Sequence, residues 1–171
     1  MLRVVLVSDF VQIDQPFAAV REALEAAGPS WLGESLVAAY AEGEQLSARV
    51  FSAIGPIRLS KRVWAELGEP EVKHDRVTQP LRWRAAGATG LFPVMVADLE
   101  FTPMGAGMTS ISFMGRYVPP LGPLGRQADR TLFHRVAEAS VRALLARVAD
   151  RFVDGAAEAR LRVGEASPAP G

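Results

Sequence analysis

The C-terminal part of the sequence carries a long stripe of apolar residues, and this stripe limits the folds open to the chain. Between about residues 124 and 153 the apolar positions follow one another in steps of three, four and one, as on one face of a single helix. About 29 residues at 1.5 Å each give a length of about 43 Å. Gly155 is expected to end this helix, and residues 156–163 to form a short helical extension. The stripe comprises Ala128, Leu132, Phe133, Val136, Ala137, Val141, Leu144, Leu145, Val148, Ala149 and Phe152.

The middle of the chain alternates between apolar and polar residues, as strands with one buried face do. Strands are predicted over 46–53, 57–67, 71–78, 81–86, 92–102 and 108–118, separated by turns rich in Gly and Pro. Pro80 is expected to break the sheet or to lie at its edge. The last two strands have the clearest apolar faces, which consist of Met95, Ala97, Leu99 and Phe101 on one and Ile111, Phe113 and Tyr117 on the other.

The N-terminal segment predicts one strand followed by two short helices. The strand covers Leu2 to Val11, and because its first half is apolar on both faces we expect it to be buried on both sides. The first helix begins near Asp14 and Pro16 and ends at about residue 27. The second covers about residues 31–42, after Ser30 as its N-cap.

This order of elements predicts an α+β fold. Links of hairpin length favour an antiparallel sheet over alternating βαβ units. The long helix is the only predicted element large enough to cover the apolar face of such a sheet. We therefore expect a curved antiparallel sheet of about seven strands wrapped around the C-terminal helix, with two short helices after the first strand. The concave space between sheet and helix is a natural ligand cavity.

Composition excludes several classes of function. The 171 residues suit one domain, and 19 basic residues balance 19 acidic ones, so no nucleic-acid partner is expected from overall charge. The absence of cysteine removes disulfides, thiol catalysis and cysteine-based zinc sites. No apolar run is long enough for a membrane span and the N-terminus lacks the order of a signal peptide, so a cytoplasmic protein is the default expectation.

The link before the last helix carries a resemblance. Gly115, Tyr117, Pro119, Pro120 and Gly122 form a Gly-x-Tyr-x-Pro-Pro-x-Gly pattern, and with the order of elements it resembles small bacterial members of the START-like, helix-grip (SRPBCC, polyketide cyclase-like) superfamily. The resemblance implies one START-like domain over residues 1–154, with 155–171 as a partly disordered C-terminal extension. The superfamily includes proteins that bind lipids, hormones or polyketides, cyclases and protein-partner modules, so the resemblance selects no single activity.

The predicted site is an apolar cavity without a cofactor. Its ligand would be a hydrophobic or amphipathic small molecule, lipid-like or aromatic, and the alternative for the same residues is ordinary core packing. A second hypothesis is an enzyme of the cyclase or aromatase type, and a third is an interaction module with a closed cavity and an exposed apolar patch elsewhere. Homodimerisation is left open. The predicted lining residues are Trp83, Leu99, Phe101, Phe113, Tyr117, Phe133, Val136 and Val141.

The conventional catalytic groups are few. Tyr117 is a candidate donor to a ligand carbonyl and Arg116 a candidate partner for a carboxylate. The simpler interpretation is that Tyr117 bonds to the backbone of the Pro-Pro link and that Arg116 is solvated. His74 and His134 are expected at the surface, and two isolated histidines without an HExxH motif predict no metal site. The catalytic residues are therefore unknown, and the sequence favours a binding protein over an enzyme.

One charged cluster has a structural explanation. Asp98 and Glu100 share a face of one predicted strand, and Arg82 and Arg84 share the like face of the strand before it. We expect a cross-strand charge ladder on the convex side of the sheet rather than a pair of catalytic carboxylates.

Overall fold

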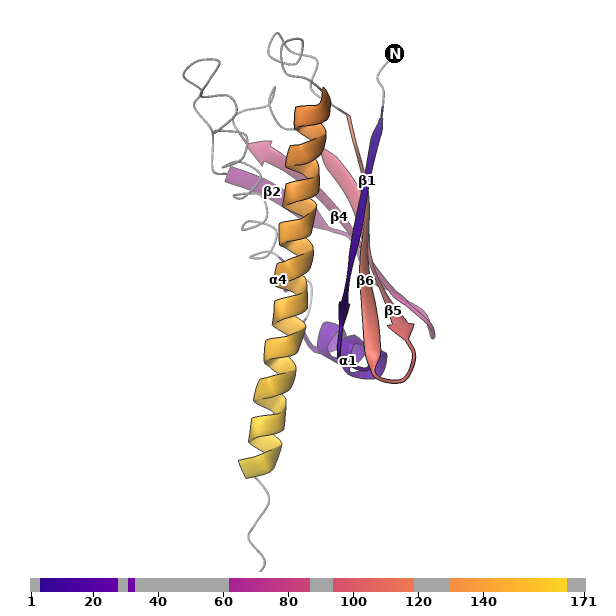
Figure 1. Ribbon diagram of the computed structural model, residues 1–171, viewed down its shortest axis with the longest axis vertical. Helices are drawn as coiled ribbons and strands as arrows, with labels where there is room; N and C mark the ends of the chain where they lie inside the picture. The colour runs from indigo at the N-terminus through magenta and orange to yellow at the C-terminus, as the bar shows by residue number, and fades with distance from the viewer. Residues whose placement is uncertain (1–3, 28–30, 33–61, 87–93, 119–129, 166–171) are drawn as a thin grey trace, which may run out of the picture.

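The computed structural model describes residues 4–27, 31–32, 62–86, 94–118 and 130–165. Within these residues the chain forms six strands and two helices, and it is an α+β protein (Figure 1). In chain order the elements are β1 (Val5–Ile13), α1 (Phe17–Ala27), β2 (Arg62–Leu67), β3 (Glu71–Val72), β4 (Val77–Ala86), β5 (Met95–Met104), β6 (Met108–Tyr117) and α4 (Arg130–Glu165).

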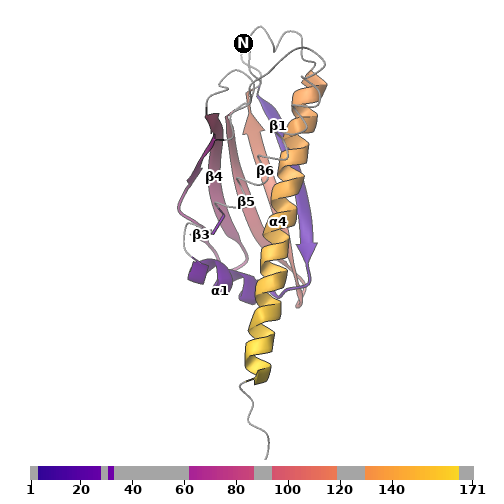
Figure 2. The same cartoon turned by 90° about the vertical axis from the view of Figure 1, so that its left-hand side faces the viewer.

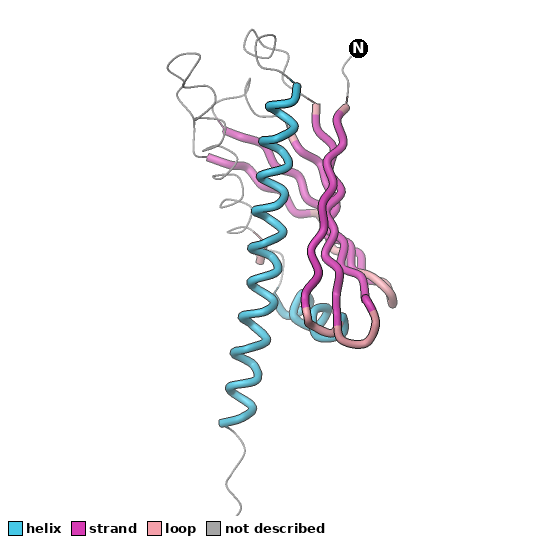
Figure 3. The backbone as a smooth tube through the Cα atoms, in the orientation of Figure 1, coloured by secondary structure: helices cyan, strands magenta, loops and turns pink. Residues whose placement is uncertain are grey.

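The six strands form one curved antiparallel sheet. Their order is β1-β6-β5-β4-β2, and β3 pairs with the first residues of β4. Figure 3 shows the strands gathered on one side of the long helix. The β5–β6 hairpin closes on a three-residue turn, in which Gly105 adopts a φ of 70° that most side chains avoid. The order of pairing confirms the antiparallel sheet expected from the hairpin-length links.

The two helices cover one face and one end of the sheet. α4 runs along the inner face, packed against β1 and β6, and α1 lies across the end of the sheet where β1 finishes (Figure 2). The carbonyl of Pro16 accepts the first hydrogen bonds of α1, from the N–H groups of Ala19 and Val20. The hydroxyl of Thr109 donates to the carbonyl of Gln15 at 2.8 Å, which ties the start of α1 to the start of β6.

A cluster of buried apolar residues lies between the sheet and α4. The predicted stripe is confirmed wherever its side chains are described, since Val141, Leu144, Leu145, Val148 and Phe152 are all buried. The predicted faces of β5 and β6 are confirmed as well. Their buried members are Met95, Ala97, Leu99, Phe101, Ile111, Phe113 and Tyr117.

The expected two-sided burial of the first strand is wrong. β1 lies at one end of the sheet formed by the described strands, and its outward side chains Leu6 and Phe10 are 74% and 64% exposed. The reason is that α4 covers the inner face alone. Apolar residues occur on the outer face of β1 because such residues favour strands, and not because that face is buried.

The expected break at Pro80 is also wrong. β4 runs without interruption from Val77 to Ala86, and β3 is only two residues long. The carbonyl of Pro80 accepts a hydrogen bond from the N–H of Gly68, so residue 80 directs its backbone groups toward the turn between β2 and β3. A missing N–H costs no ladder hydrogen bond to β5 at this position, which is why proline is tolerated.

The last helix is longer than predicted. α4 continues through Gly155 to Glu165, 36 residues in all, or about 54 Å at 1.5 Å per residue. A single helical glycine costs about 1 kcal/mol relative to alanine, and the following residues, rich in Ala, Glu, Arg and Leu, favour helix. Over the described part of the chain, neither helix has a segment apolar and long enough to cross a membrane.

Several predictions fall outside the described residues. They are the strand at 46–53, the first half of the strand at 57–67, the link at 119–123 and the helix start at 124–129. Of the second short helix only Trp31 and Leu32 are described, and they lie in a turn.

Candidate functional site

A pocket of about 410 Å³ lies between α1 and the edge of the sheet formed by β2, β3 and β4. Arg21, Leu24 and Glu25 line it from α1, where the i, i+3, i+4 spacing places them on one side of the helix. We call this space the α1 pocket. The sheet side contributes Leu67, Gly68, Glu69, Pro70, Val72, Val77 and Gln79, and Trp31 completes the lining.

The pocket exists because two short strands share one long neighbour. β2 ends at Leu67 and β3 begins at Glu71, while β4 continues past both. The turn at 68–70 therefore crosses β4 at Gln79 and Pro80. A Cβ on Gly68 would lie 2.9 Å from the Cβ of Pro80, so only glycine fits this crossing without a shift.

Gln79 fastens the turn to the strand. Its Nε2 donates to the carbonyl oxygens of Gly68 at 2.7 Å and Pro80 at 3.1 Å, and the side chain is only 3% exposed. The N–H of Gly68 donates in return to the carbonyl of Pro80 at 2.9 Å. This polar clasp forms the edge of the pocket and fixes the Gln79 side chain with its amide hydrogens already used.

The floor of the pocket is apolar and continuous with the core. Leu24, Leu67, Val72 and Val77 supply aliphatic surface. The ring of Trp31 lies 6.1 Å from that of Phe101 and 5.8 Å from that of Phe152, and those two rings pack edge to face at 5.7 Å. Such tilted aromatic pairs are stabilising, so Trp31 gives the pocket a well-packed wall.

The rim of the pocket carries charge. The Nε atom of Arg21 lies 3.9 Å from Oε1 of Glu25, and both side chains are well exposed. Glu69 in the turn is exposed as well. An apolar floor beneath a charged rim suits a molecule that is apolar at one end and polar at the other.

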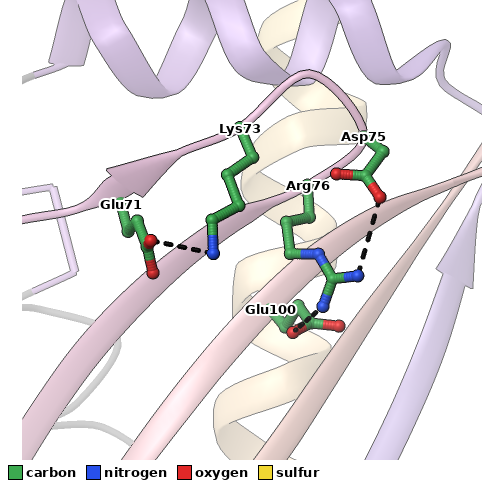
Figure 4. A network of polar contacts seen from close by, with 5 residues as sticks. All are labelled: Glu71, Lys73, Asp75, Arg76 and Glu100. Atoms are coloured by element: carbon green, nitrogen blue, oxygen red, sulfur yellow. Dashed lines mark hydrogen bonds and ion pairs between the residues drawn. The ribbon is translucent and has the colours of Figure 1, made fainter.

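A set of ion pairs follows the β3–β4 hairpin beside the pocket (Figure 4). Lys73 approaches Glu71 at 2.8 Å, and Arg76 approaches Asp75 at 3.6 Å and Glu100 at 3.4 Å. These pairs are largely exposed, so each contributes little to stability. Their effect is to join the hairpin to the outer face of β5.

A second hollow, of about 550 Å³, separates α1 from the C-terminal half of α4. Small side chains on α1, among them Ala19, Ala23 and Ala26, face Arg151 and Phe152 across it. Fewer large apolar side chains line it than line the α1 pocket.

Five of the eight predicted lining residues lie in the core rather than around the α1 pocket. Leu99, Phe101, Phe113, Tyr117 and Val141 are all buried in the core between sheet and α4. Trp83 pairs in register with Met95 in β4 and β5, and Phe133 and Val136 lie in the first two turns of α4. The role of these eight residues as a ligand site stays a prediction.

Tyr117 lies in the core and interacts electrostatically with Glu138, a residue of α4. Burial raises the pKa of its hydroxyl above the usual 10.0, and the carboxylate of Glu138 raises it further. Oε1 of Glu138 lies 3.2 Å from Nε2 of His134, while Nδ1 of His134 is buried without a hydrogen-bond partner in the structure. Tyr117 therefore keeps its proton at ordinary pH and can act only as a neutral hydroxyl there.

Two surface predictions are confirmed. His74 and Asp75 are exposed in the β3–β4 turn, and Arg116 is exposed on the opposite face from Tyr117. Neither contributes to the α1 pocket.

Arg82, Asp98 and Glu100 of the predicted charge ladder lie on the outer face of the sheet, but no ion pair joins the described members of the ladder to one another. Register places Arg82 opposite Val96 and Asp98 opposite Pro80, and Glu100 pairs with Arg76 instead. Among the described residues no group of three His, Cys, Asp or Glu side chains is placed to hold a metal ion.

The sequence analysis missed the polar residues of the pocket. Gln79 would have stood out in an uninterrupted strand, since Val77, Gln79 and Leu81 then share the inner face and one of them is polar. The break assumed at Pro80 concealed this pattern. Arg21, Glu25 and Glu69 carry no comparable signal, because exposed charges are common on helices and turns.

Comparison with known proteins concerns the fold. No protein-family model matches the chain, and no curated protein sequence matches it. The crystal structure of a conserved protein from Geobacillus kaustophilus superposes with a TM-score of 0.51 at 9% identity, over 88% of this chain and 96% of that one. This chain has a helix-grip fold, an antiparallel sheet curved around a C-terminal helix. At this identity the likeness to other helix-grip proteins extends to architecture alone.

Two further structures are similar at lower scores. Ara h 8.0201 gives a TM-score of 0.46 at 8% identity, over 89% of this chain and 99% of that one. A norcoclaurine synthase point mutant from Thalictrum flavum, in complex with a transition-state analogue, gives 0.45 at 7% identity, over 88% and 97%. Scores below 0.5 add no argument about the function of this helix-grip chain.

Proposed function

We propose that this helix-grip protein binds a hydrophobic or amphipathic small molecule in the α1 pocket. The observation that carries the proposal is the pocket itself, with a volume of about 410 Å³, an apolar floor against Trp31 and a charged rim. Ligand sites in proteins typically enclose roughly 300–1,000 Å³ and combine apolar walls with a few polar groups. The size and chemistry of the α1 pocket both fall in that class.

The geometry favours binding over catalysis at this pocket. Its ionisable groups, Arg21, Glu25 and Glu69, lie at the exposed rim, where water competes for them. The polar group nearest the floor, Gln79, is a neutral amide. A polyketide cyclase-like enzyme, the alternative from the sequence, would need a buried ionisable group directed at the ligand.

Native mass spectrometry of freshly purified protein tests the proposal. We expect a stoichiometric small molecule on the folded protein that is released by denaturing extraction. Replacing Leu24 with Trp fills the pocket and should abolish the added mass, while Ala18→Trp on the exposed face of α1 should retain it. A clean apo mass, together with no thermal shift from lipids or aromatic polyketides, would contradict the proposal.

One observation favours a second candidate, an interaction with a second copy of the chain. Leu6 and Phe10 of β1 flank the position opposite Met114 of β6, and all three side chains are exposed on the outer face. Arg116 and Asp98, which carry opposite charges, lie next to Met114. A second chain related by two-fold symmetry can therefore place its Asp98 against Arg116 of the first chain, and the reverse. An apolar strip of this kind is typical of an interface.

Sedimentation over a range of concentrations tests this second candidate. The wild-type chain should dimerise and Met114→Lys should remain monomeric, because a charge in the centre of the strip opposes burial. A wild-type monomer at the highest attainable concentration would rule out self-association through this face.

A further inference from the structure

We propose that the α1 pocket selects amphiphiles whose polar group is a hydrogen-bond donor without negative charge, such as an ammonium, and discriminates against carboxylates. This inference rests on the proposed binding function and names the ligand class for the same pocket. Three features of the pocket carry it: the balance of charge at the rim, the state of Arg21, and the orientation of Gln79.

The rim is acidic. Among the lining residues that the structure describes, Glu25 and Glu69 supply two carboxylates against the guanidinium of Arg21. Within the described part of the chain, Glu69 takes part in none of the ion pairs, so no described cation lies within ion-pair distance of its carboxylate. A cationic head group at the rim would meet an uncompensated carboxylate.

The described cation of the rim, Arg21, already has a carboxylate partner. Arg21 lies one helical turn before Glu25, and the 3.9 Å between Nε of Arg21 and Oε1 of Glu25 is an i, i+4 contact. A ligand carboxylate that approached Arg21 would therefore also approach Glu25. Like charges at this separation oppose binding, so Arg21 gives little net attraction to an anion.

The buried side chain of Gln79 also favours ligands that donate a hydrogen bond. Nε2 of Gln79 has two hydrogens, and it donates to the carbonyls of both Gly68 and Pro80. The remaining polar atom of that side chain is Oε1, which can only accept. The N–H of Gly68 is also used, by the carbonyl of Pro80, and Pro70 carries no N–H. A ligand hydroxyl or ammonium can bond to Oε1 of Gln79, whereas a carboxylate has no hydrogen to offer it.

Three probes of equal tail length test the inference: dodecylamine, dodecanol and dodecanoate, titrated below micelle formation by calorimetry at pH 7 and low salt. Dodecylammonium should bind about tenfold more tightly than dodecanoate, an electrostatic difference that shrinks as salt screens the rim. Dodecanol should lie between them. Equal or tighter binding of dodecanoate would overturn the inference while leaving the binding function intact. Binding of none of the three would refute the proposed function instead.

A matched pair of variants separates the pocket from overall charge. Glu69→Gln removes the unpaired rim carboxylate, and Glu66→Gln makes the same change in total charge at an exposed residue of β2 outside the pocket. Glu69→Gln should reduce the ammonium preference about threefold or more, and Glu66→Gln should leave it unchanged. Equal effects of the two variants would mean that overall charge sets the preference, which would overturn the assignment to the α1 pocket. Unfolding midpoints of both variants check that the fold is retained.

Discussion

Changing Gln79 to Glu should destabilise the protein sharply, although it replaces only an amide NH₂ with an oxygen. The change removes both donors of the polar clasp, which span 2.7 Å to the carbonyl of Gly68 and 3.1 Å to that of Pro80. It also sets a carboxylate oxygen against those two carbonyl oxygens at a side chain that is 3% exposed. Both effects lower the free energy of unfolding.

The magnitude follows from these contacts. Each lost hydrogen bond contributes about 1 kcal/mol, and an unpaired charge at a buried position adds several more, so the free energy of unfolding at pH 7 should fall by about 3–5 kcal/mol. For a chain of this size, about 2–4 °C per kcal/mol corresponds to a melting temperature lower by roughly 10 °C. The assay is urea unfolding followed by circular dichroism.

The loss of unfolding free energy caused by Gln79→Glu should depend on pH. Burial raises the pKa of the new carboxyl above the unfolded value of about 4.3, so the folded state holds the proton more tightly. The deficit therefore grows as pH rises through that value and is smaller at pH 4 than at pH 7. The matched control is Gln12→Glu on the exposed outer face of β1, where the change should be within about 0.5 kcal/mol. A loss below about 1 kcal/mol at Gln79, or one equal to the control, would refute the clasp.

Three other variants test the rest of the fold. Leu144→Ala should lower the free energy of unfolding by about 2–5 kcal/mol because the side chain is fully buried, while Val153→Ala, at an exposed position, should change it by no more than about 0.5 kcal/mol. Similar losses for both variants would mean that the buried face of α4 has been assigned wrongly. Gly155→Ala should raise the free energy of unfolding by about 0.5–1 kcal/mol, since a Cβ there meets no atom within 4 Å, and a loss of stability would argue against a continuous helix. The wild-type protein should lose stability above pH 10 faster than Tyr117→Phe, because the folded state retains the Tyr117 proton that the unfolded state releases at the usual pKa of 10.0. Parallel plots of unfolding free energy against pH for the two proteins would contradict a raised pKa.

The core could be predicted from the sequence because periodicity reports directly on burial. The steps of three and four along α4 and the alternation along β5 and β6 placed residues such as Leu144, Leu99 and Phe113 correctly. Their side chains pack against one another across the sheet–helix interface, so a local pattern and the tertiary contacts agree. The antiparallel sheet followed from short links for the same reason.

The pocket could not be predicted, because it depends on how three strands meet. Pro80 was expected to interrupt the sheet, yet its backbone faces the gap between β2 and β3, so its missing N–H removes no ladder bond to β5. That position of the gap is a matter of register, which local propensity does not report. The outward apolar residues Leu6 and Phe10 were similarly ambiguous, since their composition suits a buried strand as well as an exposed one.

The position of a bound ligand tests the central claim most directly. Methyl-labelled protein saturated with dodecylamine should show nuclear Overhauser contacts from the ligand tail to Leu67, Val72 and Val77, which line the α1 pocket. Val141 and Leu144, in the core against α4, should show none. Contacts to these two core residues, with none to the three pocket residues, would place the ligand between sheet and α4 and contradict the assignment of function to the α1 pocket.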